Sequence, residues 1–121
     1  MIEIKNAKIT STMLGVEDHG ILTCWLYLEY GESGCQGCQG FGGYSLDTPD
    51  KTHVFWLRRV GCAWGMEFIN RILAVVGVEK WEQLPGKHIR VRAEHSKVHA
   101  IGNIIKDNWF CPETDLNEFK P

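Results

Sequence analysis

The stretch Ile21-Leu-Thr-Cys-Trp-Leu-Tyr-Leu-Glu-Tyr30 carries the clearest secondary-structure signal in the chain. Apolar and mixed residues alternate along it, so its side chains fall into two sets. The apolar set is Leu22, Cys24, Leu26, Leu28 and Tyr30. The other set is Thr23, Trp25, Tyr27 and Glu29. Period-two alternation of this kind predicts a β-strand with one face turned to a core.

The residues before and after this strand predict more strands. Residues 2–13 alternate with a slip of phase near Asn6, which predicts a bulged strand, and the segment from Gly15 to Gly20 predicts a turn. On the other side, a hairpin turn is expected over 31–34. Beyond it we expect a third strand over 39–46, a loop over 47–52, and either a short strand or a structured loop over 54–60.

One good helix follows, from about Ala63 to Val76. Its apolar residues recur at helical spacing, and Gly77 suits the position just after a helix end. The rest of the chain predicts a short helical turn over 79–84, strands over 88–95 and 98–105 with a bulge or close approach at Gly102, and fraying after Phe110.

The element order is therefore β-β-β-(β)-α-β-β, which predicts an α+β fold. We expect an antiparallel β-sheet of about five to six strands with one main α-helix packed on one face. A chain of 121 residues suits one domain, which we assign to residues 1–112, with a polar C-terminal tail over 113–121.

The net charge of −2 is the sum of three segments whose own net charges differ in sign and size. Residues 1–50 hold two lysines and seven acids, residues 51–106 hold ten basic residues and four acids, and residues 107–121 hold one lysine and four acids. A basic block attracts phosphate or nucleic acid, or it balances the acidic first half within the molecule.

The apolar runs are shorter than the ~18–20 residues of a membrane helix, and the first residues do not form a signal peptide. Five cysteines cannot all pair within one chain. We therefore expect a cytoplasmic protein with reduced thiols and no membrane partner.

Cys35-Gln-Gly-Cys38 is either half of a zinc site, a redox pair, or two solvent-side thiols at a hairpin tip. No second Cys-x-x-Cys follows, and His95 and His99 lie too far along the chain for a zinc finger. We expect no metal and no cofactor.

A first candidate ligand surface is rich in glycine and aromatic residues. Its members are Phe41, Gly42, Gly43 and Tyr44, with Trp25 and Tyr27 on the neighbouring strand. Aromatic rings beside bare backbone make a stacking platform for a base; the alternative is a second core layer or a subunit contact.

A second candidate lies where the chain enters the helix. Arg58, Arg59, Gly61 and Trp64 combine two guanidinium groups, free amides and a stacking ring, which suits a phosphate group; the alternative is an ordinary loop with solvated arginines.

Arg90 and Arg92 share one face of a later strand, which is either a phosphate-contacting surface or a solvated one. The chain has no Gly-x-Ser-x-Gly and no His-Glu-x-x-His motif, so we do not expect an enzyme.

Four stretches resemble a family of small phage- and prophage-encoded proteins, and the Gly-Phe-Gly-Gly-Tyr run is the most specific part. They are Lys5–Cys24, Gln39–Asp47, Arg59–Phe68 and Trp81–Gly86. Among phage proteins of this size, the chain most resembles the first family of Thoeris anti-defence proteins. Those proteins are non-enzymatic sponges that bind and sequester cyclic ADP-ribose-type immune signals. The resemblance assigns no ligand residue by position.

The leading hypothesis is thus a non-enzymatic phage-type protein that sequesters a phosphorylated, cyclic nucleotide signal and so counters host antiphage defence. We expect it to be a homo-oligomer, because a second subunit would complete a pocket and cover sheet edges. The first alternative is a single-stranded nucleic-acid-binding module of phage DNA metabolism, since the segment from Trp81 to Gly86 followed by a basic strand is similar to small phage proteins of that kind. The second is an inhibitor that binds a host defence protein through Trp25 and Tyr27.

Overall fold

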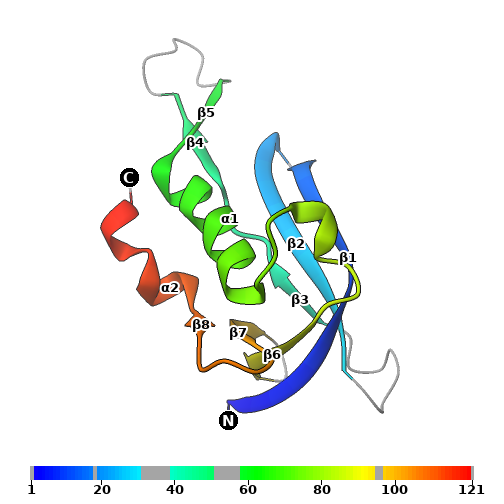
Figure 1. Cartoon of the computed structure of the whole chain (residues 1–121). Coiled ribbons are helices and arrows are strands. Elements are labelled where there is room, and N and C mark those ends of the chain that lie inside the picture. Colours follow the sequence, from blue (N-terminus) through cyan, green and yellow to red (C-terminus); the bar gives the residue numbers. More distant parts are fainter. Residues whose placement is uncertain (1, 18, 31–38, 51–57, 95–96, 121) are drawn as a thin grey trace.

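A computed structural model describes residues 2–17, 19–30, 39–50, 58–94 and 97–120. It has a six-stranded antiparallel sheet in the order β3-β2-β1-β6-β7-β8 and one main helix, α1, across one face (Figure 1). The α+β expectation is therefore confirmed. Among the described residues, no helix has the length and apolar character needed to cross a membrane.

The elements have the following bounds. The sheet consists of β1 (Glu3–Glu17), β2 (Ile21–Glu29), β3 (Gln39–Gly42), β6 (His88–Ala93), β7 (Val98–Asn103) and β8 (Trp109–Phe110). A separate two-stranded hairpin consists of β4 (Asp47–Pro49) and β5 (Arg59–Gly61). The helices are α1 (Ala63–Val76) and α2 (Pro112–Asp115), with 3₁₀ turns η2 (Trp81–Gln83) and η3 (Asn117–Phe119).

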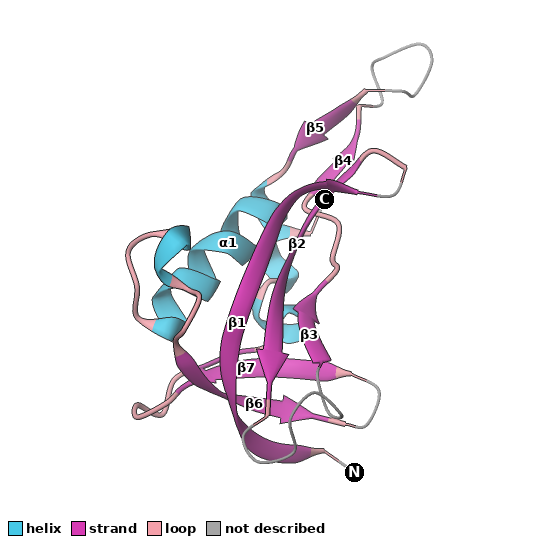
Figure 2. Cartoon of the chain, turned by 90° about the vertical axis from the view of Figure 1, so that its right-hand side faces the viewer, coloured by secondary structure: helices cyan, strands magenta, loops and turns pink. Residues whose placement is uncertain are grey.

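Strand β1 joins the two halves of the sheet. Its residues 3–8 pair with β6, and its residues 8–17 pair with β2, so that Lys8 is opposite both Glu29 and His88. Strand β6 pairs with the N-terminal part of β1 and β7 pairs with β6, whereas β2 runs beside β1 to its far end (Figure 2). The register shifts between Ile9 and Ser11, so the expected bulge exists but not at Asn6.

Strand β2 has the predicted two faces. On its inner face, Cys24, Leu26 and Leu28 are at most 2% exposed. On its outer face, Tyr27 is 40% exposed. The alternation therefore predicts the buried inner face from Cys24 to Leu28 correctly. It is wrong for Thr23, which was expected on the other face and is only 8% exposed, with its hydroxyl bonded to the carbonyl of Tyr44.

Helix α1 has the bounds expected from the sequence. Phe68, Ile72 and Val75 are buried against the sheet. Gly77 adopts the left-handed conformation with a φ of 90° and donates its N–H to the carbonyl of Leu73. A residue with a Cβ would be strained there, so the glycine defines the end of the helix.

Several boundaries differ from expectation, and strands β6 and β7 end at Ala93 and Asn103, two residues earlier than expected. Strand β1 continues through the expected turn start at Gly15 as far as Glu17. The third strand ends at Gly42, because Gly42 and Gly43 have positive φ values of 138° and 79°. Asp47–Pro49, expected in a loop, pair with β5 as strand β4. Cys35 and Cys38, for which a metal site, a redox pair and two free thiols were the alternatives, lie outside the described residues.

The C-terminal segment is also not frayed as expected. Residues 112–119 form α2 and η3, and Leu116 is 0% exposed within the core. In Figure 1 this segment, in red, lies alongside α1. Leu116 and Phe119 pack against the core, but polar residues surround them in the sequence, so composition alone predicts a loose end.

Gly65 lets α1 approach the chain that leads into β4. A Cβ placed on Gly65 would lie 1.9 Å from the carbonyl oxygen of Leu46. We predict that Gly65→Ala lowers the free energy of unfolding by about 2–3 kcal/mol, because overpacking exceeds the ~1 kcal/mol gain in helix propensity.

Chemical denaturation of Gly65→Ala and of a control, Gly61→Ala, checks this prediction. A Cβ on Gly61 meets nothing within 4 Å, so the control should change stability by less than about 0.5 kcal/mol. Equal stabilities for the two variants would contradict the proposed close packing.

Candidate functional site

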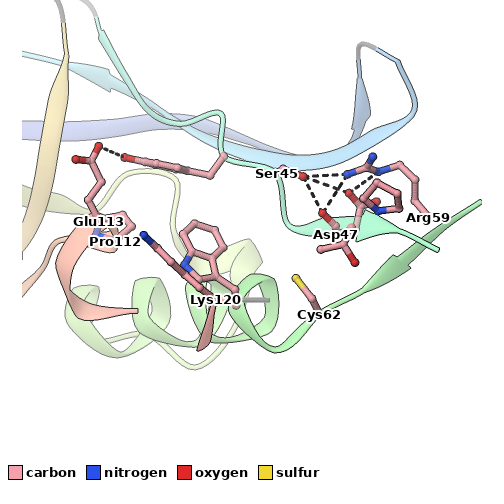
Figure 3. Close-up of a pocket in the computed structure, with 11 residues that line it drawn as sticks. Ser45, Asp47, Arg59, Cys62, Pro112, Glu113 and Lys120 are labelled. Atoms are coloured by element: carbon pink, nitrogen blue, oxygen red, sulfur yellow. Dashed lines mark hydrogen bonds and ion pairs between the residues drawn. The ribbon is translucent and has the colours of Figure 1, made fainter. Parts of the chain in front are cut away.

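A pocket of about 680 Å³ opens between the β4–β5 hairpin, the start of α1 and the C-terminal segment (Figure 3). Residues from distant parts of the chain line it. They are Tyr44, Ser45, Asp47, Thr48, Pro49, Arg59, Cys62, Trp64, Pro112, Glu113 and Lys120. Its volume is in the range of small-molecule sites, about 300–1,000 Å³.

Two aromatic rings form part of the wall. The ring centroids of Tyr44 and Trp64 are 5.7 Å apart, with the planes tilted by 52°. Both rings rest on Phe68, at centroid distances of 5.3 and 5.4 Å. The hydroxyl of Thr23 donates to the carbonyl of Tyr44 at 2.7 Å, which fixes the backbone there. The wall is therefore held in place before any ligand arrives.

Arg59 is held by an internal network on the opposite side. Its Nε donates to Asp47 Oδ1 at 2.8 Å, and its Nη2 donates to Ser45 Oγ and to the Asp47 carbonyl at 3.1 and 3.0 Å. The other carboxylate oxygen of Asp47 accepts the N–H of Leu22 at 3.2 Å. Two sides of the guanidinium group thus tie β5 to β4, and Nη1 has no hydrogen-bond partner among the described residues.

Glu113 links the C-terminal segment to the rest of the pocket wall. It accepts hydrogen bonds from the ammonium group of Lys97 and, at 3.4 Å, from the hydroxyl of Tyr44. The hydrogen bond from Lys97 is the main cause that lowers the pKa of Glu113, and the same bond raises the pKa of Lys97. Burial is the main cause that raises the pKa of Tyr44.

Two basic side chains, Arg59 and Lys120, line the pocket. Of the two, Lys120 forms no ion pair among the described residues. The formal charges of the lining residues balance, since Asp47 and Glu113 oppose Arg59 and Lys120. Because Asp47 and Glu113 are already occupied by Arg59 and Lys97, Lys120 supplies the charge left to meet an anion. Such a pocket can stack a planar ring and contact an anionic group.

Three predicted ligand residues, Tyr44, Arg59 and Trp64, are brought together here, although they come from different elements. Two others are not. Arg58 has a 66% exposed side chain paired with Asp50 at 3.7 Å, and it does not line this pocket. Gly61 lines a separate, apolar pocket.

The glycine-rich surface is filled by the protein's own side chains. Phe41 is 1% exposed and stacks on Phe68, so its ring has no face for a ligand. A Cβ on Gly43 would lie 2.5 Å from the ring of Trp25, and Gly42 packs against the backbone of β2. The bare backbone therefore accommodates Trp25, which stacks with Tyr27 at 6.3 Å, rather than leaving an open platform.

Arg90 and Arg92 lie away from the pocket, on the face of β6 opposite the core. Both guanidinium groups lie over the ring of Trp109, at 4.9 and 4.2 Å. Arg90 also donates to the carbonyls of Asn103 and Lys106. Trp109 in turn covers Gly102, where a Cβ would lie 2.7 Å from the ring, so the close approach expected at that glycine is confirmed.

The C-terminal part of the pocket was missed by sequence reasoning. Pro112, Glu113 and Lys120 fall in or beside the segment expected to fray. Pro112 at the start of a helix and the apolar pair Leu116 and Phe119 are the signals from which the segment's packing was predictable. Of the described residues, no group of three or more His, Cys, Asp or Glu side chains is placed to hold a metal ion.

Comparison with known proteins gave no match to a family model, to a curated protein or to a solved structure.

The bond between Lys97 and Glu113 gives a pH prediction. Because the folded-state pKa of Glu113 is lowered, its stabilising contribution is present above the ordinary value of 4.5 and is lost as the pH falls through the lowered value. We expect an NMR titration of the Glu113 carboxyl carbon to give a midpoint below 4.5. In Lys97→Met the midpoint should return toward the ordinary value, and an unchanged midpoint would contradict the assigned cause.

Proposed function

We propose that this protein binds a phosphorylated, cyclic nucleotide signal without turning it over, and that this sequestration counters a host antiphage defence. The observation that supports the proposal most is the pocket that gathers Tyr44, Trp64, Arg59 and Lys120 at one place. The ligand class comes from the resemblance of the sequence to the first Thoeris anti-defence family.

In this proposal the base stacks on the wall formed by Tyr44 and Trp64. Their contacts with Phe68 hold the rings in place, which reduces the ordering cost of binding. Lys120 contacts a phosphate, and the free Nη1 of Arg59 provides a second donor. Retention of an intact ligand requires only these binding contacts and no group that attacks it.

Titration calorimetry with a panel of cyclic nucleotides and cyclic ADP-ribose isomers tests the proposal. We expect one class to bind, and chromatography of the ligand after incubation to recover it unchanged. The absence of binding across the panel would refute the proposal, and recovery of an altered ligand would indicate an enzyme instead.

A variant of Lys120 tests the site itself. We predict that Lys120→Ala weakens binding of the panel's best ligand roughly tenfold, the loss expected for a charge-assisted contact with phosphate. Arg58→Ala removes the same charge outside the pocket and serves as the control, with unchanged affinity expected. If Arg58→Ala weakened binding and Lys120→Ala did not, the ligand would lie elsewhere.

A nucleic-acid-binding role remains the second candidate because of the cluster of Arg90, Arg92 and Trp109 on the outer sheet face. Single-stranded DNA binding through this cluster would fall steeply with salt and would be weakened by Arg92→Ala. Binding that is insensitive to both changes would remove this candidate.

The third candidate function is capture of a host protein through the exposed Tyr27. A pull-down from host lysate with the unmodified protein and with Tyr27→Ala tests it.

A further inference from the structure

The far half of β1 has an unpaired backbone edge. The N–H of Ile9 donates to the carbonyl of Lys87 at 2.8 Å, and its carbonyl accepts from the N–H of Gly86 at 2.7 Å. Beyond Ile9, β1 pairs with β2 on one side, and its other edge has no backbone partner among the described residues. Figure 2 shows β2 as the strand that accompanies β1 along this part. Residues 10–17 thus present an open strand edge.

This edge lacks the features by which monomers protect such strands. Thr10-Ser-Thr-Met-Leu-Gly-Val16 contains no charged residue and no proline. Natural edge strands are usually protected by lysine, proline, short length or a covering element. Here the bulge near Thr10 and the charge of Glu17 bound the neutral stretch without interrupting it. A neutral edge of this length is suited to pairing with another strand.

Apolar surface borders the open edge. Leu14 and Val16 are 43% and 65% exposed, although they lie opposite Cys24 and Leu22 in the register with β2. Leu22 also lines an apolar pocket of about 350 Å³. On α1, the same pocket includes Met66, which is 62% exposed. A partner strand would therefore gain apolar contacts in addition to backbone hydrogen bonds.

We propose that a second copy of this chain pairs with residues 10–16 of β1, antiparallel and around a two-fold axis. In such a pair, opposite residues share a face of the joined sheet, so Met13 lies opposite Met13 of the second copy. The ladder then covers the neutral stretch in both copies. It leaves Ile9, which is already bonded to residues 86 and 87, outside the interface.

The charges at the two ends of the stretch favour this partner. Lys8 and Lys87 flank one end, and Glu17 lies at the other end. None of the three forms an ion pair among the described residues. Antiparallel pairing brings Glu17 of each copy beside the two lysines of the other copy. The two-fold axis repeats this favourable contact at both ends of the interface.

The lengths of the other sheet edges favour a closed dimer. The outermost strands, β3 and β8, have four and two residues. Among its described strands, each chain therefore has one long open edge. When the two copies pair through this edge, neither copy keeps a long open edge for a third chain. No residue of β1 lines the pocket of about 680 Å³, so this proposal is independent of the proposed ligand.

Cysteine crosslinking tests the register. Directly opposite residues of antiparallel strands have Cα atoms about 4.5–5.5 Å apart, within the range for a disulfide. We expect Met13→Cys to form a covalent dimer under mild oxidation, beyond any background seen for the native cysteines. Val16→Cys is the control, since its two copies would be about 20 Å apart along the ladder.

Sedimentation analysis of the unmodified protein at micromolar concentration should show a dimer. A monomer would overturn the proposal. So would a dimer in which single cysteines at Thr12, Met13 and Leu14 all fail to crosslink, because the interface would then lie elsewhere.

A charge swap tests the polarity of the pairing. Glu17→Lys should weaken dimerisation about tenfold at low salt, because each new repulsion occurs twice in the dimer. Adding Lys87→Glu should restore part of the lost affinity, because each Glu17→Lys side chain then lies beside a carboxylate of the other copy. Lys87 is exposed and has no strand partner, so folding should be unaffected. A double variant that dimerises no more tightly than Glu17→Lys would contradict the proposed antiparallel arrangement.

Discussion

The packing of aromatic rings around Phe68 is the interaction on which the rest of the structure depends. Phe68 is 0% exposed and lies within 5.3–5.7 Å, between ring centroids, of four other aromatic residues. These are Phe41, Tyr44, Trp64 and Phe110. They come from β3, the segment after it, α1 and β8, so one side chain connects the helix to both edges of the sheet. Tyr44 and Trp64 then extend this cluster to the surface as the wall of the pocket.

The pocket is therefore a consequence of how the core ends. Its aromatic wall is the outer layer of the core, and its polar side is the network of Asp47, Arg59 and Ser45 that fastens the β4–β5 hairpin. The C-terminal segment completes it, because buried Leu116 places Glu113 and Lys120 at its rim. Asp47 is paired with Arg59 and Glu113 with Lys97, so among the described lining residues Lys120 is the cation left without an ion pair.

The parts of the fold that depend on local pattern could be predicted from the sequence. Strand β2 and helix α1 have clear periodicities, and Gly77 ends the helix through its own backbone conformation. The parts that depend on contacts between distant segments could not be predicted. Phe41 and Tyr44 are three residues apart, yet one is buried and the other lines the pocket, because the chain bends at Gly42 and Gly43.

The arginines show the same limit. Arg58 and Arg59 are adjacent in sequence, and pattern alone assigns both to a phosphate, but the pairing of β4 with β5 brings only Arg59 to the pocket. The glycine-rich run did predict a close approach. The group that approaches is the ring of Trp25, which lies on another strand of the same chain. The local sequence around the glycines therefore does not indicate which group fills the space beside them.

Purification of the protein from cells that produce a cyclic nucleotide immune signal, followed by mass spectrometry of the small molecules that heating releases, tests whether the protein sequesters such a signal. We expect an intact phosphorylated nucleotide to be released in near-stoichiometric amount. Release of no nucleotide from protein that is folded and purified from such cells would contradict it.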